Sequence, residues 1–292
     1  MFSGSLVAIV TPMHADGAVD YSAWARLIDL HLENGTSGIV VGGTTGESAT
    51  LSDAELRELT QRACAQVRGR MQVIAGAGTS STASTVERVA GISQLPVDGV
   101  LIVTPAYNRP TQEGLFRHYQ AAAAASRVPV IAYNVPSRTA VDMLPATVAR
   151  VAQLPRVVAV KEAVASVARV REILSQVPPT FVVLSGDDAS ARETVLAGAR
   201  GVISVTANVA PRAMADMIAA ALRQDEAAAR SLDAGLAGLH ESLFLEANPI
   251  PAKWALARMG LMEAAVRLPL TELDGQFHPA LERALRQVGA LR

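Results

Sequence analysis

Cysteine is almost absent from this chain of 292 residues, in which the single cysteine is Cys64. One cysteine leaves no disulfide framework and no cluster of thiolate metal ligands to propose. The same scarcity is typical of proteins that work in a reducing compartment. We therefore expect a cytoplasmic protein.

An excess of either charge is also missing, because 26 basic residues face 27 acidic ones and the formal net charge is −1. Such a balance offers no electrostatic attraction to nucleic acid or to an anionic membrane surface. Long apolar runs are lacking too: the early stretch LVAIV has no basic region before it and is too short for a signal peptide or a membrane span. The hydrophobic content of 50% is ample for a large core. The expected partner is a small molecule, with no nucleic acid and no membrane.

Lysine is the third rarity, since 24 of the 26 basic residues are arginine and the two lysines are Lys161 and Lys253. Arginine keeps its proton in any protein environment, whereas a lysine can lose it when desolvated. A lysine that persists against this bias is a candidate for chemistry that arginine cannot perform.

Eight short apolar runs recur along the chain and predict strands. They are LVAIV, GIVVG, MQVIAG, GVLIVTP, VPVIAYN, VVAVKE, FVVLSG and GVISVTAN, beginning at residues 6, 38, 71, 99, 128, 157, 181 and 201. Apolar residues on both faces are typical of parallel strands buried on both sides. The gaps hold segments with helical periodicity, several of which begin at Ser, Asp or Thr and stop at Gly or before Pro.

Eight strands alternating with eight helices predict an α/β fold, the (β/α)8 TIM barrel. A doubly wound open sheet is the alternative, but no GxGxxG follows the first run and eight repeats is the number of the barrel. The repeats end near residue 224 and no strand signal follows. We expect a catalytic barrel over residues 1–224 and a C-terminal helical domain over residues 225–292, packed on the barrel or on another subunit.

Lys161 directly follows the apolar run VVAV, at the strand end where such barrels carry their reactive groups. Branched apolar neighbours disfavour the ammonium form, and a neutral amine can attack a ketone to give an imine. A structural lysine paired with a neighbouring carboxylate is the alternative, which the strand position and the scarcity of lysine disfavour. Lys253, in a helix of the tail, is expected at the surface or at an interface.

Three further segments are expected to bring polar groups to the same end of the barrel, at the carboxyl ends of the strands. Tyr133 ends the run beside that of Lys161, where a phenol can transfer protons to and from an imine, although it could equally hydrogen-bond a loop. The turn GGTTGES over residues 42–48 precedes a helix and suits a carboxylate or phosphate, with Glu47 expected as a charge at the helix start. Arg138 can bind a carboxylate through two hydrogen bonds or form a salt bridge within a loop.

Metal catalysis is not expected. Asp187 and Asp188 could hold magnesium, but GDDAS is also typical of a turn and helix cap, and no third ligand is evident. The five histidines show no ligand spacing.

Seven motifs, taken together and in order, resemble those of a known family from end to end. They are GTTGE at 43–47, TPAYNRP at 104–110, YNVPSRT at 133–139, VAVKEA at 158–163, LSGDDAS at 184–190, GVISVTANVAP at 201–211 and NPIPAKWA at 248–255. The resemblance is to the 4-hydroxy-tetrahydrodipicolinate synthase (dihydrodipicolinate synthase) family of the N-acetylneuraminate lyase superfamily. It implies a lyase that condenses pyruvate with L-aspartate 4-semialdehyde in the diaminopimelate route to lysine, as a homotetramer (a dimer of dimers) with no organic cofactor.

The resemblance also implies residue roles. Lys161 would form the imine with pyruvate, and Tyr133 would be the general acid and base. Thr44 would link Tyr133 to Tyr107 in a proton relay, with Tyr107 supplied across the tight dimer interface.

Substrate-binding roles follow from the same resemblance. Thr45 would hold the pyruvate carboxylate and Arg138 the semialdehyde with its carboxylate. Gly186 and the main-chain carbonyl of Ile203 would shape the site near the imine.

Three other functions remain open. A pyruvate-dependent sugar-acid aldolase of the same superfamily shares the lysine and tyrosine, but Arg138 in its SRT context favours a second substrate that carries a carboxylate. A catalytically dead paralogue would be expected to have lost Lys161 or Tyr133. A metal-dependent barrel aldolase would lose activity with EDTA.

Departures from the lysine-inhibited members of the family concern a pocket at the tight interface. Those members carry a tyrosine, two histidines, an amide and an acid where this chain has, in turn, Ala106, Asp53, Leu56, Ser80 and Ser84, while Ser48 and Ala49 remain. A cationic amino acid would lose its aromatic wall and most of its polar partners. We expect weak or absent inhibition in an assay with added lysine.

Overall fold

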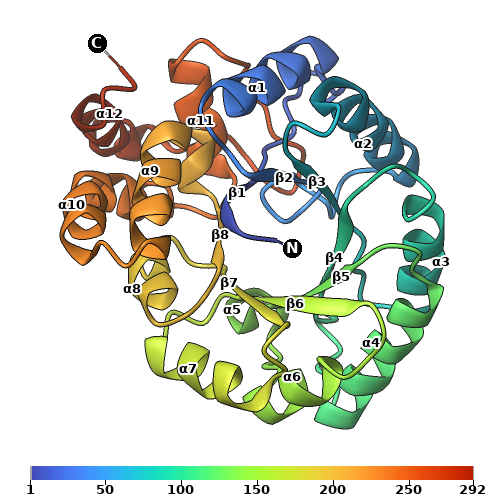
Figure 1. The fold of residues 1–292 in the computed structure, drawn as a ribbon. Coiled ribbons are helices and arrows are strands. Elements are labelled where there is room, and N and C mark those ends of the chain that lie inside the picture. Colours follow the sequence, from blue (N-terminus) through green and yellow to red (C-terminus); the bar gives the residue numbers. More distant parts are fainter. Residues whose placement is uncertain (1, 292) are drawn as a thin grey trace.

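Eight parallel strands close into a barrel in chain order in the computed structural model, which describes residues 2–291. Each strand pairs with the next, and the last pairs with the first. The strands are β1 (Gly4–Ala8), β2 (Gly38–Val41), β3 (Gln72–Gly76), β4 (Gly99–Val103), β5 (Val130–Asn134), β6 (Val157–Glu162), β7 (Val182–Ser185) and β8 (Gly201–Ser204). Figure 1 shows the helices forming a ring around the strands. The predicted (β/α)8 barrel is confirmed.

Several helices of the ring begin at a side chain that caps the first turn. The Ser52 side chain and the Glu55 side chain cap each other's backbone N–H groups at the start of the second helix, and Asp20, Ser81 and Thr111 cap the first, third and fourth. The helices are α1 (Tyr21–Glu33), α2 (Asp53–Val67), α3 (Thr82–Ile92), α4 (Gln112–Ala125), α5 (Pro136–Thr139), α6 (Pro145–Val151), α7 (Val167–Gln176), α8 (Ala191–Leu196) and α9 (Pro211–Leu222).

Side chains alternate along each strand between the barrel interior and the layer beneath the helices. On β6, Ala159 packs in the interior cluster whereas Val160 belongs to the larger cluster under the helices. On β5, Ile131 and Tyr133 lie inside and Ala132 lies outside. Both faces are therefore apolar, which explains why the strands appear in the sequence as unbroken apolar runs.

The C-terminal helices pack on the outside of the barrel. They are α10 (Glu226–Ser242), α11 (Ile250–Arg258) and α12 (His278–Gln287), with the short 3-10 turn η2 (Gly275–Phe277) before α12; a second such turn, η1 (Thr206–Asn208), lies between β8 and α9. The helix α10 packs against α8 and α9, and α12 packs against α10 (Figure 1). Leu236, Leu239 and Leu281 belong to the same apolar cluster as the helices of the ring. The division at residue 224 stays a prediction, because one core runs across it.

Two further observations concern single elements. The helix α5, which carries Arg138, lies in a segment for which a loop is expected from the sequence. Pro136 opens it, and a proline in the first turn suits a helix start because its missing N–H needs no partner there. Among residues 2–291, no helix is both long and apolar enough to cross a membrane.

Candidate active site

Lys161 on β6 and Tyr133 on β5 lie against each other in the barrel interior. They are register partners on adjacent strands, and the Lys161 Nζ atom lies 4.3 Å from the centre of the Tyr133 ring. Only 5% of Lys161 and 6% of Tyr133 is exposed. The adjacent carboxylate, Glu162, pairs with Arg169 instead, and no carboxylate within residues 2–291 forms an ion pair with Lys161. The site therefore presents a buried amine beside a phenol, without a counter-ion.

Gly186, just after β7, leaves the space that the lysine side chain occupies. A Cβ atom at this position would lie 2.8 Å from Ala163 Cβ, closer than real contacts allow, and 3.0 Å from Lys161 Cε, which is tighter than most. Ile203 on β8 is buried in the same interior cluster as Tyr133. The structure thus brings both predicted residues to the barrel interior that holds the amine.

Thr44 stands where two cavities meet. The larger has a volume of about 470 Å³ and is lined by Thr44 and Arg138, among others. The smaller, of about 30 Å³, is lined by Thr44 and Tyr133. The larger volume is in the range of small-molecule sites. Thr44 therefore lies between the cavity that Arg138 borders and the phenol beside Lys161.

Asn248 joins two of the predicted substrate-binding residues. Its side-chain N–H donates to Thr45 Oγ1 at 2.9 Å, and its main-chain carbonyl accepts from Arg138 Nη2 at 3.3 Å. Thr45 and Asn248 are buried, and the Asn248 side-chain oxygen has no hydrogen-bond partner within residues 2–291. The tail of the chain thus fixes the loop after β2 and the helix α5 relative to each other.

Tyr107 is the one predicted site residue that lies apart from the others. It is 94% exposed, on the loop between β4 and α4, and its φ of 72° is in the left-handed region. Within residues 2–291 no hydrogen bond joins it to Thr44 or Tyr133. A single chain therefore does not assemble the expected relay.

Lys253 is not at the surface, and the expectation that placed it there is wrong. The side chain is fully buried on α11 and forms an ion pair with Glu47, whose other oxygen accepts from the Arg267 backbone N–H. Burial lowers the pKa of Lys253, and the charge of Glu47 opposes this shift. The expectation for Glu47 is wrong as well, because α2 begins only at Asp53 and Glu47 lies in the preceding turns. The pair joins the loop that carries Thr44 and Thr45 to the C-terminal helices.

The carboxylates of Asp187 and Asp188 accept hydrogen bonds, mostly from backbone N–H groups. Asp187 accepts from the Ser190 N–H and hydroxyl, and Asp188 accepts from the N–H groups of Val205 and Thr206. Within residues 2–291 no group of three or more His, Cys, Asp or Glu side chains is arranged to hold a metal ion.

Comparison with known proteins decides the family. The model of the dihydrodipicolinate synthetase family matches residues 1–288. The chain belongs to this family.

Relatives and solved structures of this family agree over the whole chain. The 4-hydroxy-tetrahydrodipicolinate synthases of Ectopseudomonas mendocina and Pseudomonas aeruginosa are 51% and 50% identical over 291 residues, with all of both chains covered. The structure is similar to that of the chloride-inhibited dihydrodipicolinate synthase of Acinetobacter baumannii complexed with pyruvate, with a TM-score of 0.98, 45% identity and full coverage of both chains. The enzyme of Aquifex aeolicus matches with a TM-score of 0.95 at 41% identity, over 98% of each chain.

Two parts of this dihydrodipicolinate synthetase site were missed by reasoning from the sequence. Asn248 lies in the motif NPIPAKWA but received no role, because its partner Thr45 is 203 positions away in the chain. The polar side chains behind Tyr133 and Lys161, which are Asn134, Asp142, Glu162 and Arg169, also had no predicted role. Glu162 alone carried a signal, as a carboxylate at a strand end.

Proposed function

We propose that this chain condenses pyruvate with L-aspartate 4-semialdehyde to give 4-hydroxy-tetrahydrodipicolinate, in the diaminopimelate route to lysine. The observation that carries the proposal is the buried Lys161 amine, which lies 4.3 Å from the centre of the Tyr133 ring and has no carboxylate partner within residues 2–291. Relatives named 4-hydroxy-tetrahydrodipicolinate synthase, which are 51% and 50% identical to this chain, support it. The scarcity of disulfide-forming cysteine supports a cytoplasmic location for the activity.

The chemistry begins with the amine. Neutral Lys161 Nζ attacks the ketone carbon of pyruvate, Tyr133 supplies the proton with which the oxygen leaves as water, and an iminium remains. Loss of a methyl proton to the Tyr133 phenolate gives an enamine, because the iminium is a better electron sink than the ketone. The enamine carbon adds to the aldehyde of the second substrate, whose oxygen takes the proton of the Tyr133 hydroxyl as the iminium forms again. The amine of that substrate then attacks the iminium carbon and closes the ring, Lys161 leaves as a neutral amine, and the remaining proton of the ring nitrogen passes to the Tyr133 phenolate.

The remaining residues would bind the two substrates and position them for these steps. Thr45 would bind the pyruvate carboxylate and Arg138 the carboxylate of the semialdehyde, which the hydrogen bonds through Asn248 support. Gly186 and the Ile203 carbonyl would shape the space around the imine.

The relay would include a residue from a second copy of the chain. Thr44 would pass protons between Tyr133 and the partner copy's tyrosine at position 107. The exposure of Tyr107 in a single chain supports a partner copy at this position. The homotetramer built from two tight dimers rests on the resemblance to the family.

Sugar-acid aldolase activity is the second candidate. It would use the same imine, but a polyhydroxy aldehyde has no carboxylate to form an ion pair with a guanidinium at the cavity. Arg138 lines the larger cavity together with Thr44, which favours an acceptor that carries a carboxylate. Product analysis with pyruvate and each aldehyde separates the two.

Borohydride trapping tests the proposal directly. With pyruvate present, reduction should add to the intact mass one pyruvate less one water plus two hydrogens, and peptide mapping should place it on Lys161. Lys161→Arg keeps the charge but cannot form the imine at neutral pH, so its mass should stay unchanged. Wild-type protein that gains no mass, or a variant that gains as much, would overturn the proposed function.

A further inference from the structure

We propose that four side chains on the helix-facing side of the strand ends, behind Tyr133 and Lys161, are positioning residues that fix Tyr133 relative to Lys161. They are Asn134, Asp142, Glu162 and Arg169. We call them the strand-end network. The inference rests on the proposed function, because it assigns these residues a part in the same imine chemistry.

The strand register places the network directly beside the reactive pair. Tyr133 pairs with Lys161, and the next register pair is Asn134 with Glu162. Because side chains alternate along a strand, Tyr133 and Lys161 face the barrel interior while Asn134 and Glu162 face the helices. The Asn134 side-chain N–H donates to both Glu162 oxygens, at 3.1 and 3.2 Å. This bridge joins the two strand ends one residue beyond the reactive pair.

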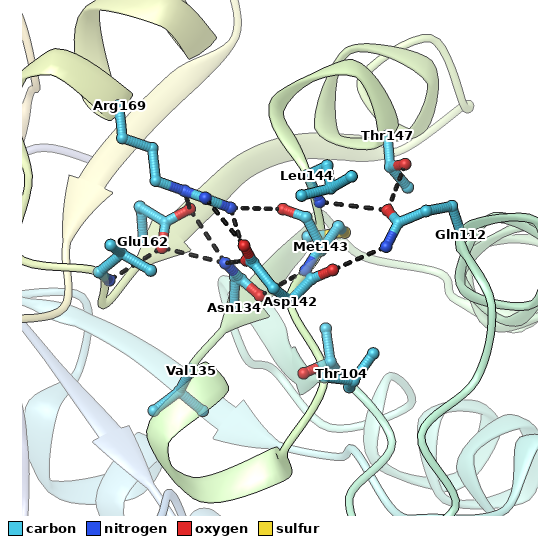
Figure 2. Close-up of polar contacts among 12 residues, drawn as sticks. Thr104, Gln112, Asn134, Val135, Asp142, Met143, Leu144, Thr147, Glu162 and Arg169 are labelled. Atoms are coloured by element: carbon cyan, nitrogen blue, oxygen red, sulfur yellow. Dashed lines mark hydrogen bonds and ion pairs between the residues drawn. The ribbon is translucent and has the colours of Figure 1, made fainter.

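Arg169 on α7 connects this bridge to the segment after α5. Its Nε donates to Glu162 at 2.9 Å, and its two terminal nitrogens donate to the two Asp142 oxygens at 3.0 and 2.6 Å (Figure 2). One of them also donates to the Met143 carbonyl at 2.8 Å. The planar guanidinium suits this forked set of bonds, which a lysine could not reproduce.

Asn134 closes the network from the other side. Its N–H donates to Asp142 at 2.9 Å and its oxygen accepts from the Met143 N–H at 2.9 Å. Gln112 on α4 extends the contacts, because it donates to the Asp142 carbonyl and accepts from the Leu144 N–H (Figure 2). The network therefore binds β5, β6, α7 and the chain that follows Arg138.

The charges show why Arg169 holds the cluster together. Two carboxylates face a single guanidinium, and Glu162 has no exposed side-chain surface. Burial raises the pKa of Glu162, against which the Val164 N–H and the charge of Arg169 act. Removal of Arg169 would leave the two carboxylates without a cation, joined only through Asn134, so they should move apart or take up protons. The ends of β5 and β6 would move with them.

Turnover per reactive lysine tests the inference. Arg169→Met removes the guanidinium with its hydrogen bonds to Glu162 and Asp142, and Arg169→Lys keeps only the positive charge. The control is Arg171→Met, which changes an exposed arginine on the same helix. Borohydride trapping with pyruvate counts the lysines that form the imine, and kcat for the condensation is divided by that count. Because misplacement by about 1 Å costs on the order of 100-fold, we expect Arg169→Met to lose roughly 10- to 100-fold in kcat per trapped site. The KM for pyruvate should change far less, Arg169→Lys should lie in between, and the control should match wild type.

The count of trapped sites separates positioning from mere folding. A purely structural network would lower the number of trapped sites but leave the turnover of each unchanged, and that result would overturn the inference while sparing the proposed function. Wild-type protein that is not trapped would overturn both. If Arg169→Met yields no folded protein, Glu162→Gln keeps the size and the acceptor for Val164. It should show the same selective loss of kcat, and wild-type turnover per trapped site in that variant would refute the inference.

Discussion

The two lysines of the chain are both buried, yet their surroundings are opposite. Lys253 has a carboxylate as its partner, so its ammonium form is compensated. Lys161 has an aromatic ring beside its amine and no carboxylate partner within residues 2–291. An arginine at position 161 would stay charged and could not form an imine, whatever its surroundings. If the proposed function is correct, imine formation accounts for the lysine at position 161, whereas at position 253 the lysine is the partner of Glu47 in a buried ion pair.

Gly186 offers a residue-scale test of how closely the site is fitted around the amine. Gly186→Ala should force Lys161 or Ala163 to move, because the added Cβ would lie 3.0 Å and 2.8 Å from their atoms. Overpacking of this kind costs about 1–3 kcal/mol of stability. We expect that loss in chemical denaturation and a slower rate of borohydride trapping with pyruvate.

The control for this variant is Gly235→Ala on α10. No atom lies within 4 Å of the Cβ that it would add, so it should be neutral or, through better helix propensity, stabilising by up to about 1 kcal/mol. Gly186→Ala protein that traps pyruvate at the wild-type rate would show that the lysine has room to spare.

At the scale of elements, the strands and most helices of the barrel were predictable from the sequence. Strands β5 and β6 are buried on both faces, so their apolar runs stand out, and a closed parallel barrel then brings Tyr133 and Lys161 to one end. The helix α5 was not predictable, because four residues that begin with proline show no helical periodicity.

The contacts between distant elements could not be predicted either. Asn248 meets Thr45 across 203 positions, and Lys253 meets Glu47 across 206. Local periodicity reports which face of a helix is apolar, but it does not report which carboxylate a buried amine will find. This is why the expectation of Lys253 at the surface or at an interface failed, although a helix in this segment, α11, is predictable from the sequence.

The ion pair between α11 and the loop after β2 yields an element-scale prediction. Loss of one partner leaves an uncompensated buried charge, so Lys253→Met and Glu47→Gln should each cost about 3–5 kcal/mol in the free energy of unfolding. The double variant should cost less than the sum of the two, as measured by urea denaturation. Arg230→Met breaks an exposed pair with Glu226 and should cost about 1 kcal/mol at most. If Lys253→Met lowered the free energy of unfolding by as little as Arg230→Met, the buried ion pair would contribute no more to stability than an exposed one.

At the scale of the whole molecule, one chain holds an incomplete version of the proposed site. Lys161, Tyr133 and Thr44 lie at the barrel interior and its mouth, whereas Tyr107 points to solvent. The Tyr107 side chain is 94% exposed on a backbone with φ of 72°, and it forms no hydrogen bond among residues 2–291. If the proposed relay is correct, Tyr107 acts in a neighbouring copy, and a symmetric dimer would exchange the residue in both directions.

Complementation between two inactive variants tests this exchange. Lys161→Ala lacks the nucleophile and Tyr107→Ala lacks the end of the relay, so each alone should be impaired. In a mixed dimer, one site would carry both lesions and the other neither, provided that Tyr107 serves the partner's site. Random pairing of equal amounts should then restore about a quarter of wild-type activity, because half the dimers are mixed and half of their sites are intact. Activity of the mixture no higher than the mean of the separate variants would mean that each chain uses its own Tyr107.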